Sequence, residues 1–149
     1  MMFLTHISFA LFIGILKIRL IPLPIDKYLF LAIVVLAALL PDLDTQSFIS
    51  KKSRLGFLRL FFEHRGFFHS ILPMVFFMIL AFLITGNPYY SLAVLIGFAS
   101  HLVFDSLTKK GVAWFWPSKL RIRGKFRTGG LIDWGLFLGF AILDLFLIL

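Results

Sequence analysis

Side chains of the metal-ligand type gather at the ends of the apolar segments of this chain. Alternating membrane crossings would bring those ends to one face. Imidazole and carboxylate groups bind divalent cations, and a chain that is 60% hydrophobic has no routine use for so many at one depth. The pattern therefore predicts a metal site at a membrane surface. The residues are all four histidines and five of the seven acidic residues, His6, His64, His69, His101, Asp42, Asp44, Glu63, Asp105 and Asp133.

The sharpest local signal is the pair His101 and Asp105. In a helix, residues four apart share one face and can reach the same ion. An Asp inside a membrane span costs about 2.5 to 3.5 kcal/mol on insertion scales, so such a residue is a functional candidate. Taken alone, the pair fits a structural hydrogen bond between helices equally well.

A second motif is Pro41-Asp42-Leu43-Asp44, which ends the second apolar segment. Two nearby carboxylates repel each other unless water or a cation neutralises them. Taken alone, this motif favours a solvated helix end.

A third motif runs from His64 to Ser70 and leads into the third apolar segment. Ser70 followed by Pro73 predicts a helix start with Ser70 as the cap and His69 just outside it. Two histidines around an Arg-Gly turn are hard to explain as core packing.

His6 opens the first apolar segment and Asp133 opens the fifth. Alone, His6 would be an interfacial residue and Asp133 a helix cap or a partner of the helix dipole. All these motifs nevertheless fall at one level of the predicted spans, which favours a shared metal site.

The absence of cysteine removes thiolate ligands, so a mixed His and Asp site suits Zn²⁺, with Mn²⁺ or Fe²⁺ as alternatives. One or two ions fit, because an Asp can bridge two. A cation lowers the pKa of water to about 7, as hydrolysis requires. Arg65 suits bidentate contact with a phosphate, and it equally suits a basic anchor on the cytoplasmic side.

The elements that must position these residues follow from composition. A mean hydropathy of +1.00 and 20 Phe in 149 residues indicate one domain, residues 1–149, solvated mainly by lipid. We expect an all-α bundle of about five transmembrane helices, several of them shorter than the roughly 20 residues of a full span. The segments are Phe3 to Leu20, Tyr28 to Leu40, Ile71 to Thr85, Tyr89 to Leu107 and Leu131 to Leu149.

Charge predicts the orientation. All of the 15 Lys and Arg residues except Lys17, Arg19 and Lys27 fall on the side of the N-terminus, which makes that side cytoplasmic in a multi-pass inner-membrane protein. The first segment lacks a cleavage pattern, so we expect it to be retained with His6. The net charge of +8 fits loops lying against anionic headgroups, and we expect no nucleic-acid partner.

Two basic segments carry further expectations. From Ser53 to Phe62, apolar residues recur at helical spacing, which fits a short interfacial helix or an ordinary connecting helix equally well. From Lys119 to Arg127, basic and apolar residues alternate, which predicts a short ribbon around Gly124. That ribbon would meet phosphate headgroups of membrane lipids, or form a basic loop without a ligand. The oligomeric state stays open.

Several motifs together resemble those of the YdjM-like inner-membrane metal-dependent hydrolases, over about residues 5 to 135. The residues that carry the resemblance are Thr5-His6, Pro41-Asp42-Leu43-Asp44, His64-Arg65-Gly66 with His69-Ser70, Gly97 to Ser100-His101 with Asp105, Thr108, Gly111 and Trp116-Pro117.

The resemblance implies an all-α hydrolase, distantly similar to the zinc-dependent phospholipase C and P1-type nuclease group. It implies that Asp105 could bridge to a second ion near His6, and that His64 is a ligand or an acid/base group. Asp133 stands where the family often has Glu, so it is not counted as a ligand. The candidate metal ligands are His6, Asp42, Asp44, His69, His101 and Asp105, and the candidate catalytic residues are His64 and Arg65.

The predicted function is hydrolysis of a phosphoester, most naturally of a lipid, at the cytoplasmic interface. Two alternatives stay open: a metal or proton transporter, and a non-catalytic membrane scaffold with a structural metal. Asp144 lies deep in the last segment, away from the predicted metal site, and none of these functions gives it a role. We expect it to pair with Lys17, Arg19 or Lys27.

Overall fold

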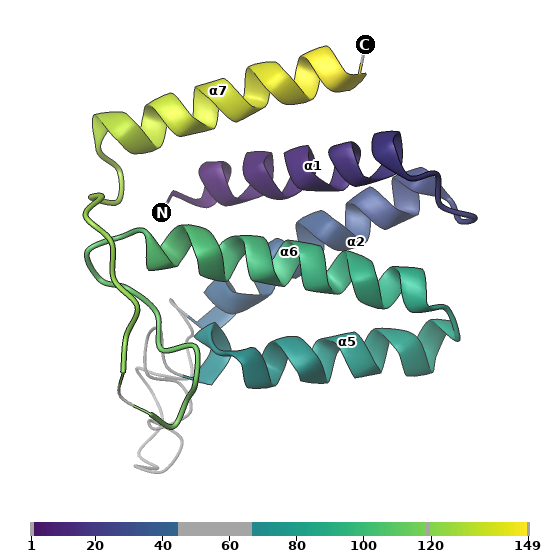
Figure 1. Cartoon of the computed structure of the whole chain (residues 1–149), viewed down its shortest axis with the longest axis horizontal. Coiled ribbons are helices and arrows are strands. Elements are labelled where there is room, and N and C mark those ends of the chain that lie inside the picture. Colours follow the sequence, from purple (N-terminus) through teal and green to yellow (C-terminus); the bar gives the residue numbers. More distant parts are fainter. Residues whose placement is uncertain (1, 45–66, 119, 149) are drawn as a thin grey trace.

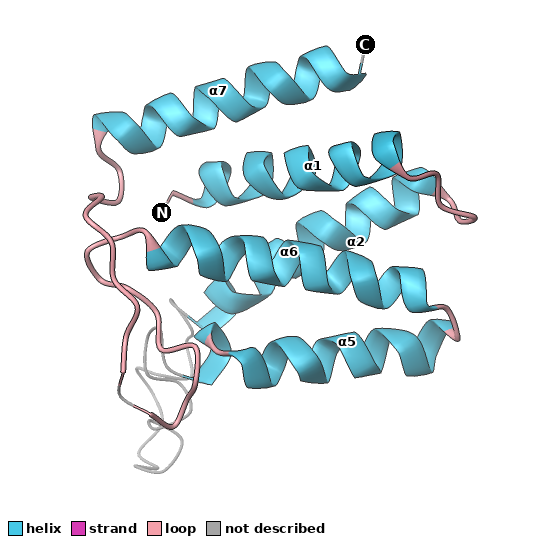
Figure 2. Cartoon of the chain, in the orientation of Figure 1, coloured by secondary structure: helices cyan, strands magenta, loops and turns pink. Residues whose placement is uncertain are grey.

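The structure, a computed structural model, describes residues 2–44, 67–118 and 120–148. Within these ranges the chain is all-α and contains no strand (Figure 1, Figure 2). Two short 3-10 turns, η1 (Leu40–Asp44) and η2 (Phe67–His69), follow α2 and precede α5. The five helices are α1 (Phe3–Leu20), α2 (Lys27–Leu39), α5 (Ile71–Thr85), α6 (Pro88–Ser106) and α7 (Leu131–Ile148). The all-α prediction and its segment boundaries are confirmed.

Polar residues between the apolar runs define where the helices begin and end. The Asp26 carboxylate accepts a hydrogen bond from the Leu29 N–H at 2.7 Å at the start of α2. Asn87 does the same for α6, and Gly86 ends α5 with a left-handed φ of 64°. Ser70 occupies the predicted cap position of α5, but its hydroxyl donates to the Phe67 carbonyl at 2.7 Å instead of accepting from the helix.

Among the helices of the described residues, only α1 and α7 are long and apolar enough to cross a membrane by length and composition. The expectation of about five transmembrane helices, several of them short, is therefore confirmed for these two, and for the other three it stays a prediction. The 13 residues of α2 extend about 20 Å at 1.5 Å per residue, short of a hydrocarbon core of about 30 Å. The apolar helix α5 has 15 residues, and the longer α6 contains His101 and Asp105, whose polarity lowers its hydropathy.

Small residues let the helices pack closely. Helix α6 contacts α1, α2 and α5, while α1 contacts α2, α6 and α7 (Figure 1). A Cβ atom at Gly97 would lie 2.1 Å from the Val34 carbonyl oxygen and 2.8 Å from the Ala37 Cβ. Only glycine allows this approach of α6 to α2, as in helix pairs within membranes. The contact lies one turn before His101, so it sets where that imidazole points.

The outward faces of the bundle are apolar. Phe76, Leu83 and Ile84 on α5 are 59%, 73% and 74% exposed, and Phe146 on α7 is 78% exposed. Side chains of this kind are stable on a surface when lipid covers them. The fold therefore presents hydrocarbon-like surface even on α5, which is too short for a full span.

The connection between α6 and α7 differs from the predicted ribbon. Residues 120–126 do not fold back on themselves around Gly124. They pair with residues 107–112 through isolated bridges between Thr108 and Phe126 and between Val112 and Ile122. Gly124 is required because a Cβ there would lie 2.0 Å from the Leu107 carbonyl oxygen. The predicted interfacial helix at 53–62 lies outside the described residues.

Candidate metal centre

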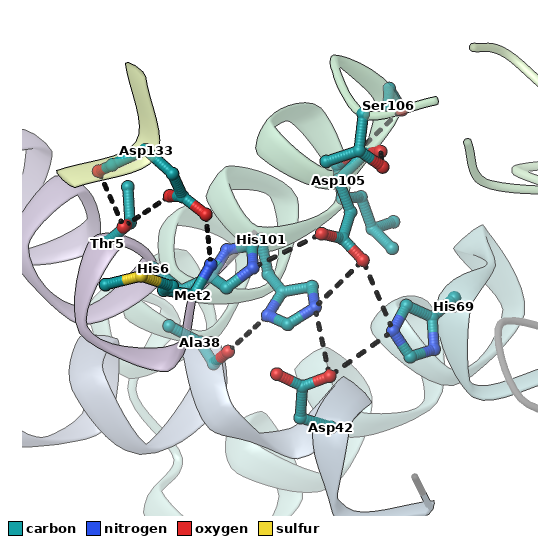
Figure 3. Close-up of polar contacts among 12 residues, drawn as sticks. Met2, Thr5, His6, Ala38, Asp42, His69, His101, Asp105, Ser106 and Asp133 are labelled. Carbon is teal, nitrogen blue, oxygen red and sulfur yellow. Dashed lines mark hydrogen bonds and ion pairs between the residues drawn. The ribbon is translucent and has the colours of Figure 1, made fainter. Parts of the chain in front are cut away.

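Five ligand-type side chains converge at one end of the bundle (Figure 3). They come from α1, η1, η2 and α6, which are far apart in the sequence. Four are no more than 2% exposed, while the Asp42 side chain is 30% exposed and forms the accessible edge. The five residues are His6, Asp42, His69, His101 and Asp105.

The distances among these groups fit coordination better than hydrogen bonding. The Nε2 atom of His6 lies 3.3 Å from Asp105 Oδ1. The Nε2 atoms of His69 and His101 lie 3.7 and 3.8 Å from Asp42 Oδ1, and 3.8 and 3.9 Å from Asp105 Oδ2. Hydrogen bonds between N and O span about 2.7 to 3.2 Å. Ligands about 2.0 to 2.1 Å from one tetrahedral ion lie roughly 3.3 to 3.4 Å apart, close to what is found here.

Two groups of three each place their ligand atoms within 4.8 Å of one another. One comprises His6, Asp42 and His101, and the other comprises His69, His101 and Asp105. His101 belongs to both groups, so either one ion or two neighbouring ions would involve this residue.

The orientation of His101 is set by the backbone of α2. Its Nδ1 lies 2.7 Å from the Ala38 carbonyl oxygen, which can only accept, so Nδ1 carries the hydrogen. In the neutral ring, Nε2 then presents its lone pair to the carboxylates of Asp42 and Asp105. Two acceptors facing each other repel unless a cation lies between them, and a carbonyl on the other ring nitrogen is the usual support of a metal-binding histidine.

The buried ring nitrogens of the histidines also favour a bound cation. His101 Nε2 and both ring nitrogens of His6 have no hydrogen-bond partner in the part of the chain that the structure describes. The two rings are stacked, with centroids 3.9 Å apart and planes 11° apart. Two protonated rings in this arrangement would repel strongly. A bound metal ion would take a lone pair from His101 Nε2 and one from a ring nitrogen of His6 without protonating either ring, so the residues present fit such an ion.

Asp42 is ionised at neutral pH. Burial by itself raises the pKa of Asp42, but the contact with His69 and the nearby His101 and His6 rings outweigh this effect and leave the pKa below its usual value. A carboxylate that is charged and partly accessible is suited to bind a cation and to border an open side of the site.

Asp133 is kept apart from this cluster by its own hydrogen bonds (Figure 3). Its Oδ1 accepts from the Thr5 hydroxyl at 2.7 Å, and its Oδ2 accepts from the backbone N–H groups of Met2 at 2.9 Å and Gly129 at 2.8 Å. We refer to Asp133, Thr5, Met2 and Gly129 as the Asp133 clamp. It ties the start of α7 to the start of α1, next to His6. Sequence reasoning missed this role, although Thr5 and Asp133 both stand at segment ends on the same predicted face.

Three of the candidate site residues have side chains that the structure does not describe. Asp44 ends η1, and its side chain is outside the described residues, as are His64 and Arg65. Asp144 is 7% exposed, and no ion pair joins it to Lys17, Arg19 or Lys27, all of which the structure describes. The predicted pairing is wrong, and Arg19 donates to the Leu147 carbonyl.

Comparisons with known proteins assign the chain to a family. The model of the YdjM inner membrane protein family matches residues 1–148. The chain is 36% identical over 105 residues to YvsG of Bacillus subtilis (strain 168), covering 66% of this chain and 63% of YvsG. It is 31% identical over 97 residues to inner membrane protein YdjM of Escherichia coli (strain K12) and of Shigella flexneri, covering 60% of this chain and half of each relative. No solved structure matches the chain. With nearly its whole length matched, the chain belongs to the YdjM inner membrane protein family.

Proposed function

We propose that this chain is a membrane-bound, metal-dependent hydrolase of a phosphoester, most naturally that of a lipid. One observation carries the proposal: three imidazoles and two carboxylates converge at ligand spacing, and only one of them, Asp42, is partly exposed. A purely structural metal site is normally closed on all sides, whereas a catalytic site keeps one side open.

The proposed cofactor is one or two divalent ions, with Zn²⁺ favoured by the His and Asp ligand set. When bound, such an ion supplies a charge that acidifies water and neutralises a phosphoryl oxygen. Asp105 is suited to serve two ions, because its Oδ1 faces His6 while its Oδ2 faces His69 and His101. Asp42 would border the side from which a substrate approaches.

Two further roles rest on sequence position alone. Arg65, four positions before His69, would bind a phosphoryl oxygen through its planar guanidinium group. His64 would transfer a proton or act as a further ligand. Both residues lie outside the described ranges, so their roles stay predictions.

A lipid substrate is supported by where the site lies. The exposed residues of α5 and α7 are apolar, so we propose that the whole bundle is embedded, with α2, α5 and α6 accommodated by tilt or local thinning. The positive-inside bias then places the N-terminus and the cluster at the cytoplasmic headgroup level. Lipid phosphoesters are concentrated at that depth.

The decisive experiment measures metal content and hydrolysis in the same preparations. Protein purified in a neutral detergent is stripped with chelator, reloaded with Zn²⁺, Mn²⁺ or Fe²⁺, and assayed by mass spectrometry for metal and with phospholipid and simple phosphodiester substrates. We expect about one or two ions per chain and turnover that His101→Ala abolishes. Asp144→Asn, a buried acidic residue outside the cluster, is the matched control and retains both.

Other outcomes would contradict the proposal. Stoichiometric metal without turnover of any phosphoester would indicate a structural metal in a scaffold. Metal uptake into liposomes without hydrolysis would indicate a transporter. A chain that holds no metal after reloading would overturn the metal site itself.

A further inference from the structure

We propose that the connection between α6 and α7 forms a groove that binds the phosphate group of an anionic phospholipid. Two adjoining hollows of about 400 and 460 Å³ lie there. Both are lined by Lys109, Phe126 and Arg127, and Lys125 borders the first while Lys110 borders the second. The groove is distinct from the metal centre, and the inference does not depend on hydrolytic activity.

Charge complementarity identifies the occupant as an anion. Lys109, Lys110, Lys125 and Arg127 are all exposed, and among the residues that the structure describes no acidic side chain lines either hollow. Asp133, the acidic residue closest to the groove in sequence, is fully buried and accepts three hydrogen bonds at 2.7 to 2.9 Å. Lys and Arg side chains around a concave surface attract a phosphate and contact it directly.

The backbone holds the two sides of the groove together. The Lys109 N–H donates to the Phe126 carbonyl at 2.9 Å, and the Phe126 N–H donates to the Leu107 carbonyl at 3.1 Å. Lys109 and Arg127, 18 positions apart in the sequence, are therefore held next to each other where both line the two hollows. A preorganised pair of this kind loses less entropy on binding than two free surface side chains.

Apolar surface at one end of the groove favours a lipid over a free phosphate ion. Leu131 and Ile132 line the first hollow, begin α7, and are 92% and 55% exposed. Trp134 follows and is 48% exposed, as expected for an aromatic residue at the interface. Because α7 is one of the two helices able to cross a membrane, acyl chains would run along it while the headgroup occupies the basic hollows.

The groove makes the sequence expectation for Lys119 to Arg127 more specific. Lys109, which lies outside that range, contributes to both hollows, whereas Arg121 and Arg123 line neither. This division supplies a matched pair of variants: Lys109→Gln with Arg127→Gln inside the groove, and Arg121→Gln with Arg123→Gln outside it. Each double variant removes two positive charges from the same connection.

Binding is measured by native mass spectrometry of the metal-loaded protein in a neutral detergent. The probes are short-chain phosphatidylglycerol, phosphatidylcholine with the same acyl chains, and inorganic phosphate. We expect a preference for phosphatidylglycerol that the groove variant weakens by about 10- to 30-fold and the control variant by less than about 3-fold. Inorganic phosphate should bind far more weakly, because it lacks acyl chains to cover Leu131 and Ile132.

Three results would overturn the proposal that this groove binds an anionic phospholipid. Equal weakening in the two double variants would indicate unspecific attraction, tight binding of inorganic phosphate would indicate a soluble ligand, and no preference for phosphatidylglycerol would exclude anionic lipid. Helix content and bound zinc, measured on the same samples, report folding and the metal centre separately. Should the groove variant fail to fold, Lys109→Gln alone, expected to weaken binding about 3-fold or more, is decisive in its place.

Discussion

Asp105 and Asp133 are two aspartates at the same end of the bundle, 1% and 0% exposed, yet their surroundings differ in kind (Figure 3). The carboxylate of Asp133 accepts three hydrogen bonds of 2.7 to 2.9 Å. The carboxylate of Asp105 faces three imidazole nitrogens at 3.3 to 3.9 Å. Burial alone therefore does not identify a functional carboxylate.

The chemistry of the neighbours explains the difference. Backbone N–H groups and a hydroxyl donate without any change of protonation, so the Asp133 clamp is complete in itself. An imidazole nitrogen donates only when it carries a proton, and His101 already uses its Nδ1 hydrogen on Ala38. The clamp is therefore satisfied by its own donors, whereas the cluster around Asp105 is one that could hold a cation. Four predictions test this contrast, from the largest expected effect to the smallest.

Asp105→Asn should lower the affinity for Zn²⁺ by on the order of 100-fold or more. The substitution keeps the shape of the side chain and removes its charge, and even groups that only support ligands are worth 10- to 100-fold. Competition of the purified protein with a fluorescent zinc chelator measures the effect. The matched Asp133→Asn variant should stay within about tenfold of the unaltered chain, and equal losses in both would refute the contrast.

Asp133→Ala should lower the free energy of unfolding by about 3 kcal/mol. The substitution leaves the N–H groups of Met2 and Gly129 and the Thr5 hydroxyl without their acceptor, and each of these three hydrogen bonds is worth about 1 kcal/mol. Denaturant unfolding in detergent, followed by circular dichroism, measures the change. A folded Asp133→Ala protein that has lost its metal would instead place Asp133 in the metal centre.

Zinc affinity should fall as the pH is lowered from 8 to 5, because protons compete with the metal for the imidazole nitrogens. Asp42 does not contribute to this loss of zinc affinity, because its pKa is lowered and its carboxylate stays charged until more acidic pH. Titration calorimetry between pH 8 and 5 tests the profile. A zinc affinity that does not change over this range would exclude the histidines as ligands.

Thr5→Val should cost about 1 kcal/mol, the ordinary value of one hydrogen bond, with little change in metal content. The substitution keeps the shape and removes the hydroxyl that Asp133 accepts. Thr85→Val is the control, because the Thr85 hydroxyl donates to the Ala81 carbonyl on an exposed surface and its loss should cost under about 0.5 kcal/mol. Indistinguishable unfolding midpoints for the two variants would show that the clamp adds no stability.

The helices were the most predictable feature. Each apolar run becomes a helix within one residue of its predicted ends, because Asp26, Asn87 and Gly86 act locally on the backbone beside them. Span number was less predictable, since α2 and α5 are apolar but shorter than the bilayer. The partner expected for Asp144 was also not predictable from the sequence. Arg19 donates to the Leu147 carbonyl, and that contact depends on how α1 packs against α7.

For the candidate site, the order of residues was enough to name the ligand types and to pair His101 with Asp105, since four positions in a helix define a face. The sequence alone could not show that Asp133 accepts a hydrogen bond from Met2, which lies 131 positions away. Nor could it show that the Ala38 carbonyl, 63 positions from His101, fixes the orientation of the His101 ring. Those assignments came only with the folded bundle. Gly97 lets α6 approach α2, and packing between distant segments decides which buried carboxylate accepts from backbone N–H groups and a hydroxyl and which one faces imidazoles.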